Sequence, residues 1–405
     1  MAVIVQKYGG SSVADIDKIR KVAGMVAAVR REGYDMAVVV SAMGKTTDEL
    51  LAMARSISPT PKKRELDMLF STGERITMAL LAMALEEQGV ESISLTGSQC
   101  GIITNARHTD ARVIEVRPFR VQDEMARGKV VIVGGFQGVS YKRDVTTLGR
   151  GGSDTTATAL AAALGAERCE VYSDVDGVYT ADPSAVEDAR HLPQISYQEM
   201  QEMSRAGAKV LAAQAVEFAK NAGIAIYTRS AFEPGRETVV RTMPPGTPRG
   251  VRAVVSERDV IRVRVRGACA AGRFAELLAI FEEARVPVKE LSATTLEEEI
   301  SWSRASFVIS RTNLHNWPTV LEMLRERAGD EVEIDDGLAA VSLIGEGINN
   351  DNSTLIATLN LLGDRGVAVL GVATTSFRIS CLVQESGIDE VVRACHERWI
   401  EQQVP

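Results

Sequence analysis

Up to residue 230, the chain alternates short apolar runs with stretches of helical periodicity. The runs AVIVQ and MAVVVSAM (Met36–Met43) predict buried strands, and Ile16–Arg31 between them predicts a helix. The later runs SISLTG, VVIVGGF and CEVYSDV predict further strands, each next to a helical stretch. This alternation is typical of βαβ units with a mostly parallel sheet covered by helices on both faces. The loops that follow the strands should then gather at one edge of the sheet, where such folds bind ligands.

The pattern changes after TMPPGTPRGVRA, a Pro- and Gly-rich stretch at Thr242–Ala253 that predicts a linker. Beyond it, IRVRVRG at Ile261–Gly267 alternates strictly and predicts a strand with one solvent-facing side. Strands and helices then recur in the order of two βαββαβ units, with helices expected at Ala275–Arg285, after Pro318, at Ser353–Asp364 and at the chain end to Trp399. On this pattern alone, ligand binding and a structural or dimerising role are equally good interpretations. The expected domains are residues 1–245, a linker at 246–258, and two modules at 259–332 and 333–405.

Charge and residue usage limit the partners that the chain can have. The 405 residues carry a formal net charge of −8, which disfavours a nucleic-acid binder because such proteins need a basic face. No run of about 18 apolar residues occurs, and the N-terminus MAVIVQKYGG predicts a strand rather than a signal peptide. We therefore expect a cytoplasmic protein without a membrane contact. Scattered cysteines without a CxxC pair predict reduced thiols and no structural metal site, and the four histidines are expected at surface or loop positions.

The stretch GRGGSDTTATALAAALGA, Gly149–Ala166, places a cation, glycines, a hydroxyl and a carboxylate ahead of an Ala-rich run. Glycine backbone can close on an oxyanion, and a helix start adds the positive end of a dipole. Ser153 and Asp154 are common N-cap residues, so a helix is expected to begin there. Arg150 can bind a carboxylate or phosphate through two parallel hydrogen bonds. This favours an enzyme with a small anionic substrate; a capped helix after a glycine turn is the alternative.

Further polar strings follow other predicted strands. Lys7 in KYGGSSV ends the first strand, and its ammonium group suits a phosphoryl group in transfer. The alternative is a strand-end lysine in solvent. Ser41 and Thr47 in SAMGKTTDEL can hydrogen-bond a substrate, although helix-start chemistry explains them better when they are taken alone. Glu74, near an expected helix start in FSTGERITMALLA, would attract a substrate ammonium group, and a first-turn acid that complements the helix dipole is the commoner explanation.

The string EVYSDVDGVYTADPSAV, at Glu170–Val186, is the second strong signal. Asp174 and Asp176 follow a strand, where carboxylates can hold Mg²⁺ or orient cationic side chains. Tyr179 can line an adenine pocket, and turn formation is the alternative for any single acid. Lys209 in GAKVL, at an expected helix start, would add a second cation to match Lys7, whereas a lysine on a helix is usually solvated.

Taken together, these strings resemble the aspartate kinases of the amino-acid kinase superfamily. The matching strings are KYGGSSV, VSAMGKTTDEL, STGE, FQGV, TLGRGGSDTTA, YSDVDGVYTADP and GAKVL, in the family's order and spacing across residues 1–240. The two C-terminal units resemble the family's pair of ACT regulatory modules, so the resemblance covers nearly the whole chain. It implies an α/β amino-acid kinase fold, a three-layer arrangement with a mainly parallel sheet and helices on both faces, followed by two ferredoxin-like βαββαβ ACT modules.

The resemblance implies transfer of the γ-phosphoryl group of ATP, with Mg²⁺, to the side-chain carboxylate of L-aspartate. That carboxylate is ionised at pH 7, so catalysis needs alignment and charge neutralisation rather than a general base. The implied catalytic residues are Lys7, Asp154, Asp174 and Lys209. The implied ATP-binding residues are Lys7, Tyr8, Gly9, Gly10, Gly151, Gly152, Ser173, Asp174, Tyr179, Asp182, Ser184 and Lys209. The implied aspartate-binding residues are Ser41, Thr47, Glu74, Arg150 and Ser153.

Three stretches differ from the family pattern. Ser184 stands where the family commonly has a basic residue that can touch the ATP phosphates. The first module has GACAAGR at Gly267–Arg273 instead of an Asp-x-Pro-Gly-like turn, and VPVKELSATT and VAVLGVATTSFRIS replace Asn-rich effector strands. The modules imply a homodimer or higher oligomer. Feedback by lysine or threonine, another effector and a purely dimerising role all stay open, as does strand exchange between the modules.

Two other functions stay open at this point. A kinase of the same fold could phosphorylate glutamate or an acylated amino acid, which the implied aspartate-binding side chains and the tandem ACT modules disfavour. A catalytically silent amino-acid sensor would have lost one of the four implied catalytic residues, and all four are present.

Overall fold

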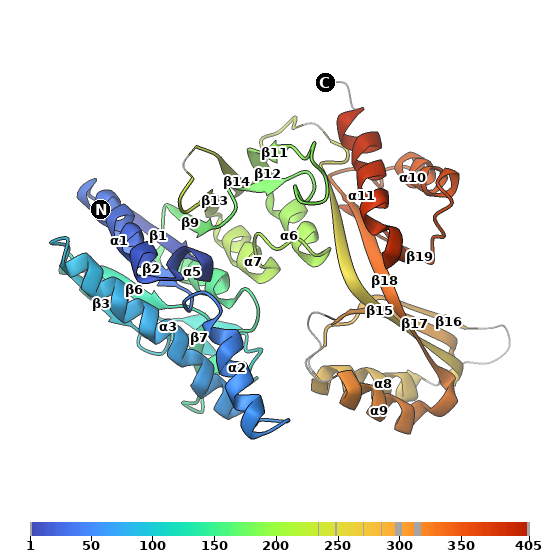
Figure 1. Cartoon of the computed structure of the whole chain (residues 1–405), viewed down its shortest axis with the longest axis horizontal. Coiled ribbons are helices and arrows are strands. Elements are labelled where there is room, and N and C mark those ends of the chain that lie inside the picture. Colours follow the sequence, from blue (N-terminus) through green and yellow to red (C-terminus); the bar gives the residue numbers. More distant parts are fainter. Residues whose placement is uncertain are drawn as a thin grey trace. The chain divides into compact units, whose positions relative to one another are not determined.

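The computed structural model describes residues 2–233, 235–247, 249–269, 271–284, 286–295, 302–311 and 317–402. The chain divides into two compact units (Figure 1). The N-terminal unit comprises Met1–Val178, His191–Ser204 and Lys209–Thr247. The C-terminal unit comprises Tyr179–Arg190, Arg205–Ala208 and Pro248–Pro405. Two short segments from before residue 245 therefore belong to the C-terminal unit, which the sequence pattern did not indicate.

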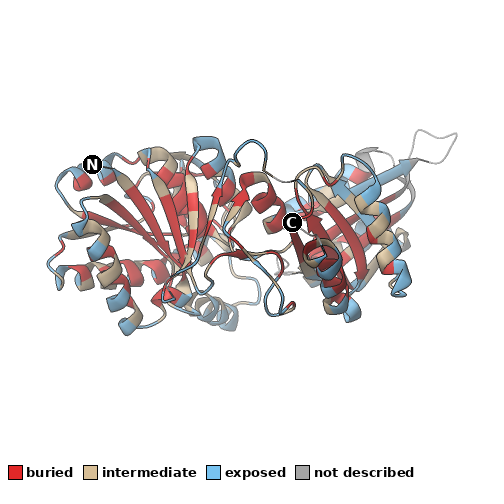
Figure 2. Ribbon diagram, turned by 90° about the horizontal axis from the view of Figure 1, so that it is seen from above, coloured by how far each residue is buried: buried red, intermediate tan, exposed pale blue. Residues whose placement is uncertain are grey.

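The N-terminal unit is built on a sheet that has, in its described residues, eight strands in the order β12-β14-β13-β9-β1-β2-β6-β3. The strand bounds are β1 Val3–Tyr8, β2 Asp35–Val40, β3 Ser92–Leu95, β6 Val130–Gly134, β9 Arg168–Ser173, β12 Gln194–Ser196, β13 Ala225–Ser230 and β14 Glu237–Arg241. β14 runs antiparallel to β13, and the other paired strands are parallel. Valine-rich strands such as β2 and β6 are buried because helices cover both faces (Figure 2). The predicted parallel α/β fold is confirmed.

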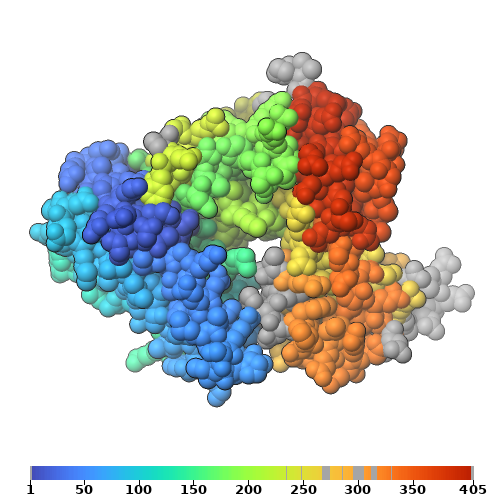
Figure 3. Space-filling view, viewed as in Figure 1, coloured from blue at the N-terminus to red at the C-terminus, as the bar shows by residue number. Residues whose placement is uncertain are grey.

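Helices pack on both sides of this sheet. α1 (Ile16–Arg31) and α3 (Lys63–Glu86) share an apolar core with β2 and β6 on one face. α5 (Gly152–Leu164) and α7 (Ala213–Ala222) pack together against β1, β9 and β13. The remaining helices of the unit are α2 Thr46–Ile57, α4 Phe119–Ala126 and α6 Tyr197–Arg205. α1 has the bounds predicted from its periodicity, and α1 to α3 form the outer surface on the face shown in blue colours in Figure 3.

α3 is long and apolar enough to cross a membrane by length and composition alone, with a mean hydropathy of 1.3. Its buried side, however, includes the polar residues Asp67, Ser71, Glu74 and Thr77 beside Phe70 and Leu81. The helix packs against β3, β6 and β8. These contacts are those of a core helix in a folded domain.

A second, smaller sheet has in its described residues four strands in the order β5-β4-β7-β8. Their bounds are β4 Ile102–Thr104, β5 Val113–Val116, β7 Gln137–Ser140 and β8 Val145–Thr147. β8 leads directly into the glycine-rich segment that precedes α5, so this sheet fixes where that segment begins. The small sheet was not predicted, because the strands that form it are short and mostly lack a clear alternating pattern.

The C-terminal unit contains an antiparallel sheet whose described strands lie in the order β16-β17-β15-β18-β20-β19. The strands are β15 Ala253–Cys269, β16 Lys289–Thr295, β17 Trp302–Ser310, β18 Val332–Ile344, β19 Gly371–Thr375 and β20 Arg378–Gln384. The helices are α8 Ala271–Ala284, α9 Trp317–Ala328, α10 Ser353–Asp364 and α11 Ile388–His396. The predicted succession of strands and helices is confirmed.

β15 and β18 are long strands that serve two separate cores (Figure 1). In the first module, Ile261, Val263 and Val265 of β15 pack beneath α8 and α9. In the second module, Val254 of β15 packs with β18, β20 and α11. The register shifts between these halves, where Asp259 adopts a positive φ of 55°. Residues 253–257, which were expected in the linker, thus form an edge strand of the second module. The first half of β18 is the last strand of the first module, and the expected boundary at 332/333 would separate it from that module.

Candidate active site

A cavity of about 300 Å³ lies at the carboxyl ends of β1 and β2 in the N-terminal unit. It is lined by Lys7, Gly9, Gly10, Ser41, Ala42, Gly44, Thr47, Glu74, Phe136, Gly149, Arg150, Gly151, Gly152, Ser153 and Asp154. Most of the sequence-predicted site residues of this unit therefore line one cavity, as the rule for parallel sheets requires. Phe136 and Gly149 also line it, although neither was singled out as a site residue.

Lys7 and Asp154 form a buried ion pair in this cavity. Lys7 stands near the end of β1, and its Nζ lies 2.6 Å from Oδ1 of Asp154, the third residue of α5. Only 8% of Lys7 and 7% of Asp154 is exposed. Removing one partner would leave the other charge buried and uncompensated, so the pair fixes both side chains.

The glycine-rich segment delivers the start of α5 to the cavity. Gly149 and Gly151 adopt left-handed conformations with φ of 74° and 73°, which favour glycine. A Cβ on Gly152 would stand 2.8 Å from the Leu148 side chain, so this position also needs glycine. Gly151 is the N-cap, and Ser153 and Asp154 lie inside the first turn rather than before it. The N-cap is therefore Gly151 rather than the predicted Ser153 or Asp154. The Gly152 N–H donates to the Gly149 carbonyl at 3.1 Å, and the next N–H groups of the first turn lie beside the ion pair.

Glu74 is a buried carboxylate with one unused oxygen. Its Oε1 accepts a hydrogen bond from the Ala42 backbone N–H at 3.2 Å, whereas Oε2 is buried without a hydrogen-bond partner among the described residues. Burial raises the pKa of Glu74 to about 7. Glu74 lies in the middle of α3 rather than near a helix start, because that helix begins at Lys63. A buried, half-satisfied carboxylate in a cavity is suited to a cationic ligand group.

Ser41, Thr47 and Arg150 complete the rim of the cavity. Ser41 follows β2, and its backbone N–H donates to the carbonyl of Tyr8 on the neighbouring strand. Thr47 lies in the first turn of α2, and the Arg150 side chain is exposed. Ser41 and Thr47 come from the connection between β2 and the first turn of α2, and Arg150 comes from the glycine-rich segment, so the rim forms only in the folded protein.

Other sequence-predicted residues do not line the cavity. Tyr8 is fully buried and stacks on Tyr172, with ring centroids 4.8 Å apart, so its side chain belongs to the core. Ser173 is the last residue of β9, the strand next to β1, and Asp174 follows it. Lys209 is exposed and precedes α7, which begins at Ala213, so this lysine is not on the helix.

The segment 179–190 belongs to the C-terminal unit. Ala181 and Val186 pack in the apolar core of the second module, and Thr180 Oγ1 lies 2.8 Å from Nε2 of His396. Tyr179 is half-buried; Asp182 and Ser184 are exposed and hydrogen-bond each other through Asp182 Oδ1, which accepts from the Ser184 N–H and hydroxyl.

The fully buried His396 contradicts the expectation that all four histidines take surface or loop positions. A lone histidine in an amphipathic helix carries no sequence signal that separates a core position from an exposed one.

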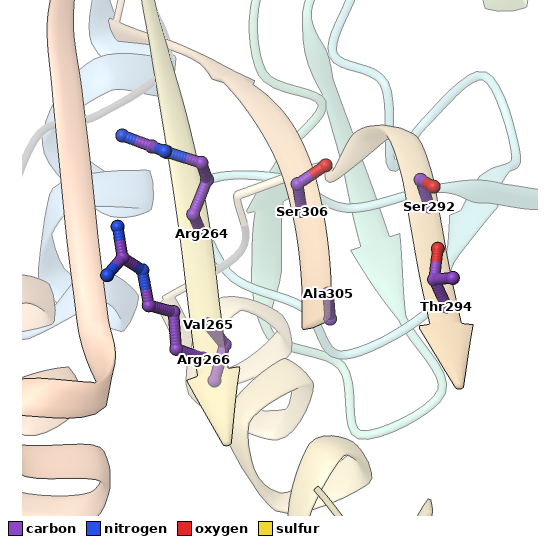
Figure 4. Close-up of a pocket in the computed structure, with 7 residues that line it drawn as sticks. All are labelled: Arg264, Val265, Arg266, Ser292, Thr294, Ala305 and Ser306. Atoms are coloured by element: carbon purple, nitrogen blue, oxygen red, sulfur yellow. The ribbon is translucent and has the colours of Figure 1, made fainter. Parts of the chain in front are cut away.

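A second cavity, of about 250 Å³, lies on the C-terminal sheet (Figure 4). It is lined by Arg264, Val265, Arg266, Ser292, Thr294, Ala305 and Ser306. The guanidinium groups of Arg264 and Arg266 point toward β18 in Figure 4, where acids on that strand pair with them. Arg264 Nη2 lies 2.9 Å from Asp335 Oδ1, and Arg266 Nη2 lies 2.5 Å from Glu333 Oε1. The alternating arginines of IRVRVRG therefore form a cross-strand ladder of ion pairs.

Comparisons with known proteins identify the family. The chain matches the amino acid kinase family over residues 2–230. It is 42% identical over 405 residues to the aspartokinase of Mycolicibacterium smegmatis, which covers 98% of this chain and 96% of that protein.

Two solved structures share the fold. Aspartokinase III of E. coli in complex with aspartate and ADP, in the R-state, has a TM-score of 0.82 at 24% identity, covering 98% of this chain and 99% of that one. The same enzyme with lysine and aspartate, in the T-state, has a TM-score of 0.74 at 24% identity with the same coverage. At this identity the structural likeness concerns the fold, and the sequence similarity carries the assignment. This chain belongs to the amino acid kinase family and, within it, to the aspartokinases.

Proposed function

We propose that this chain transfers the γ-phosphoryl group of ATP to the side-chain carboxylate of L-aspartate, yielding 4-phospho-L-aspartate and ADP. The observation that carries the proposal is the buried Lys7–Asp154 pair, 2.6 Å apart, in the same cavity as the unpaired oxygen of Glu74. One cavity thus offers a cation for a phosphoryl group and an anion for an ammonium group. Aspartate and ADP are the ligands of the E. coli relative.

Lys7 supplies the charge that the transfer step requires. Its ammonium group has three donors, and the ion pair with Asp154 leaves two for phosphoryl oxygens. The acceptor carboxylate is already ionised at neutral pH, so no side chain has to remove a proton from it. Negative charge is spread over the γ-phosphoryl oxygens during transfer, so a fixed cation lowers the barrier by neutralising that charge.

In this proposal the α-ammonium and α-carboxylate groups of the substrate aspartate are bound by different side chains. Glu74 accepts the α-ammonium group with its unused oxygen, and Arg150 binds the α-carboxylate. Ser41, Thr47 and Ser153 donate the remaining hydrogen bonds. With the backbone fixed, the side-chain carboxylate extends toward Lys7.

The nucleotide lies along the start of α5 in this proposal. The glycine backbone at Gly9, Gly10, Gly151 and Gly152 lets the phosphates approach closely, and Lys209 adds a second cation. Tyr8 contributes only its backbone. The remaining nucleotide contacts come from Ser173, Asp174, Tyr179, Asp182 and Ser184.

Asp154 and Asp174 are the carboxylates that suit Mg²⁺, which usually binds through one or two carboxylates plus substrate phosphates. No group of three or more His, Cys, Asp or Glu side chains that could hold a metal ion occurs among the described residues. When bound, Mg²⁺ neutralises phosphate charge.

The C-terminal modules provide regulation and assembly in this proposal. We assign them an amino-acid effector, since E. coli aspartokinase III was solved with lysine in its T-state. Lysine and threonine are the candidates, and the Gly267–Arg273 stretch that would begin the effector site includes residues outside the described part of the chain. A homodimer formed through the modules and a cytoplasmic location belong to the same proposal.

An ADP-release assay with aspartate and with glutamate tests the function. We expect turnover with aspartate and little with glutamate, because an extra methylene displaces the acceptor carboxylate from Lys7. Turnover with glutamate alone would assign another acceptor. Amino-acid binding without any turnover would indicate a sensor and refute the kinase proposal. Repeating the assay with lysine, threonine, both or neither tests the effector.

A further inference from the structure

Asp67 is a fully buried carboxylate that the proposed reaction does not use. It lies on α3, two helical turns before Glu74, and so faces the same side of the helix. Its Oδ1 accepts hydrogen bonds from Thr147 Oγ1 at 2.6 Å and from the Thr109 backbone N–H at 2.9 Å. Its Oδ2 lies 2.6 Å from Nδ1 of His108. The desolvation of this carboxylate is therefore offset by contacts from two further segments.

The two segments bound by Asp67 adjoin the arginine that lines the cavity. Thr147 is the last residue of β8, and Gly149 and Arg150 follow it. The 105–111 loop packs on this segment, because the Ala111 N–H donates to the Thr147 carbonyl at 2.8 Å. A Cβ on Gly149 would stand 3.1 Å from Asp110 Oδ1. One carboxylate thus joins α3, the 105–111 loop and the start of the glycine-rich segment.

The backbone conformation of Thr109 is a second sign that the contact between Asp67 and the 105–111 loop is important. Thr109 has a positive φ of 69°, a conformation that β-branched residues rarely adopt. Such a conformation persists only where surrounding contacts impose it. Asp67 provides that contact by accepting a hydrogen bond from the Thr109 N–H, next to His108, which also binds Asp67.

We propose that Asp67, with Thr147 and His108, is a positioning group that sets the distance between Glu74 and Arg150. This inference rests on the proposed function, in which those two side chains bind the α-ammonium and α-carboxylate groups of aspartate. Asp67 shares a helix with Glu74 and binds Thr147 at the end of β8, three residues before Arg150, so its contacts fix both anchors relative to each other. These contacts meet the glycine-rich segment at Thr147, before Arg150, whereas Gly151 and Gly152 lie at the start of α5, which packs on β1 and β9. Their loss should therefore weaken aspartate binding more than nucleotide binding.

Thr147→Val tests the proposal with little change in volume. It removes the hydroxyl that donates to Asp67 and should raise the KM for aspartate about ten-fold, because a lost hydrogen bond to a buried carboxylate has an effect of that order. The KM for ATP should stay within about two-fold, because the nucleotide contacts are untouched. Thr147→Ser keeps the donor and should restore the aspartate KM.

Thr146→Val is the matched control. Thr146 is the preceding residue of β8, and its hydroxyl forms an equally short bond of 2.6 Å with Thr104, also buried. Successive strand residues point to opposite faces, so this bond does not adjoin Asp67. The control should lower the midpoint of thermal unfolding as Thr147→Val does, while leaving both KM values unchanged.

The outcomes separate this inference from the function on which it rests. Absence of aspartate-dependent turnover in the unmodified chain would refute the proposed function and this inference with it. Normal turnover combined with equal aspartate KM values in Thr147→Val and Thr146→Val would overturn the positioning role alone. If Thr147→Val fails to fold, His108→Gln tests the same carboxylate from a partly exposed position and should raise the aspartate KM selectively.

Discussion

The two cavities of this protein both contain cationic side chains, yet their charges are arranged in opposite ways. In the N-terminal unit, Lys7 is buried, pairs with the single acid Asp154 and lines the cavity. In the C-terminal unit, Arg264 and Arg266 are partly exposed and pair with Glu333 and Asp335 on the adjacent strand. In the first arrangement a single buried cation faces a cavity. In the second, several cations pair with acids along two neighbouring strands.

The origin of the charges in the sequence explains this difference. Lys7 and Asp154 are far apart in the chain and meet because β1 and the start of α5 share one edge of the sheet. The arginines of β15 recur at every second residue and face acids at the same spacing on β18. Charged residues that are isolated in the sequence and meet in a cavity therefore indicate a reactive site. Charged residues that alternate along a strand indicate stabilisation of the sheet.

Lys7→Ala should have the largest effect on activity. We expect kcat to fall about a thousand-fold, because a fixed cation at the transferring group acts mainly in the transition state. The KM for aspartate should change far less. Steady-state ADP release measures both constants. Thermal unfolding checks that the variant still folds although the buried Asp154 has lost its partner. An unchanged kcat would remove Lys7 from the mechanism and with it the contrast between the cavities.

Arg150→Ala should have the next largest effect, on aspartate binding. Loss of a two-point contact with a carboxylate should raise the KM for aspartate about 100-fold, with a smaller change in kcat. Arg150→Lys keeps the charge without the planar fork and should recover only part of the affinity. An aspartate KM equal to that of the unmodified chain in both variants would refute the clamp.

The raised pKa of Glu74 predicts that the kcat/KM for aspartate depends on pH. Burial raises the pKa of Glu74 to about 7, and only its ionised form attracts the ammonium group. The kcat/KM for aspartate should therefore rise with pH up to about 7 and level off above it, with a loss of about ten-fold per pH unit on the acid side. Glu74→Gln should lower kcat/KM and flatten this limb. An acid limb that persists unchanged in Glu74→Gln would belong to another group.

Much of the fold could be predicted from the sequence, because its elements follow local rules. Ile16–Arg31 and Ser353–Asp364 were predicted with their observed bounds, since their periodicity ends at clear turns. β15 was only partly predicted: the linker composition before Ala253 hid the fact that one strand serves two modules. That sharing depends on pairing with β18, which local pattern cannot reveal.

The candidate site was predicted where glycines and charges are adjacent in sequence. The 149–154 segment and Lys7 lie together in the cavity, as expected from the strand edge. Asp67 and His108 were missed, because a buried carboxylate inside a helix and a loop histidine resemble ordinary surface residues. The burial of His396 was missed for the same reason. Only tertiary contacts distinguish such residues.

Arg264→Ala should have the smallest effect and completes the comparison of the cavities. Its ion pairs with Glu333 and Asp335 are partly exposed, so we expect the free energy of unfolding to fall by only about 0.5 kcal/mol. kcat and both KM values, measured without an effector, should stay within about two-fold because the ladder is a structural feature. The loss of stability should shrink at high salt, which screens exposed pairs. A large fall in kcat with unchanged stability would mean that the second cavity acts on the reaction, and the contrast with Lys7 would fail.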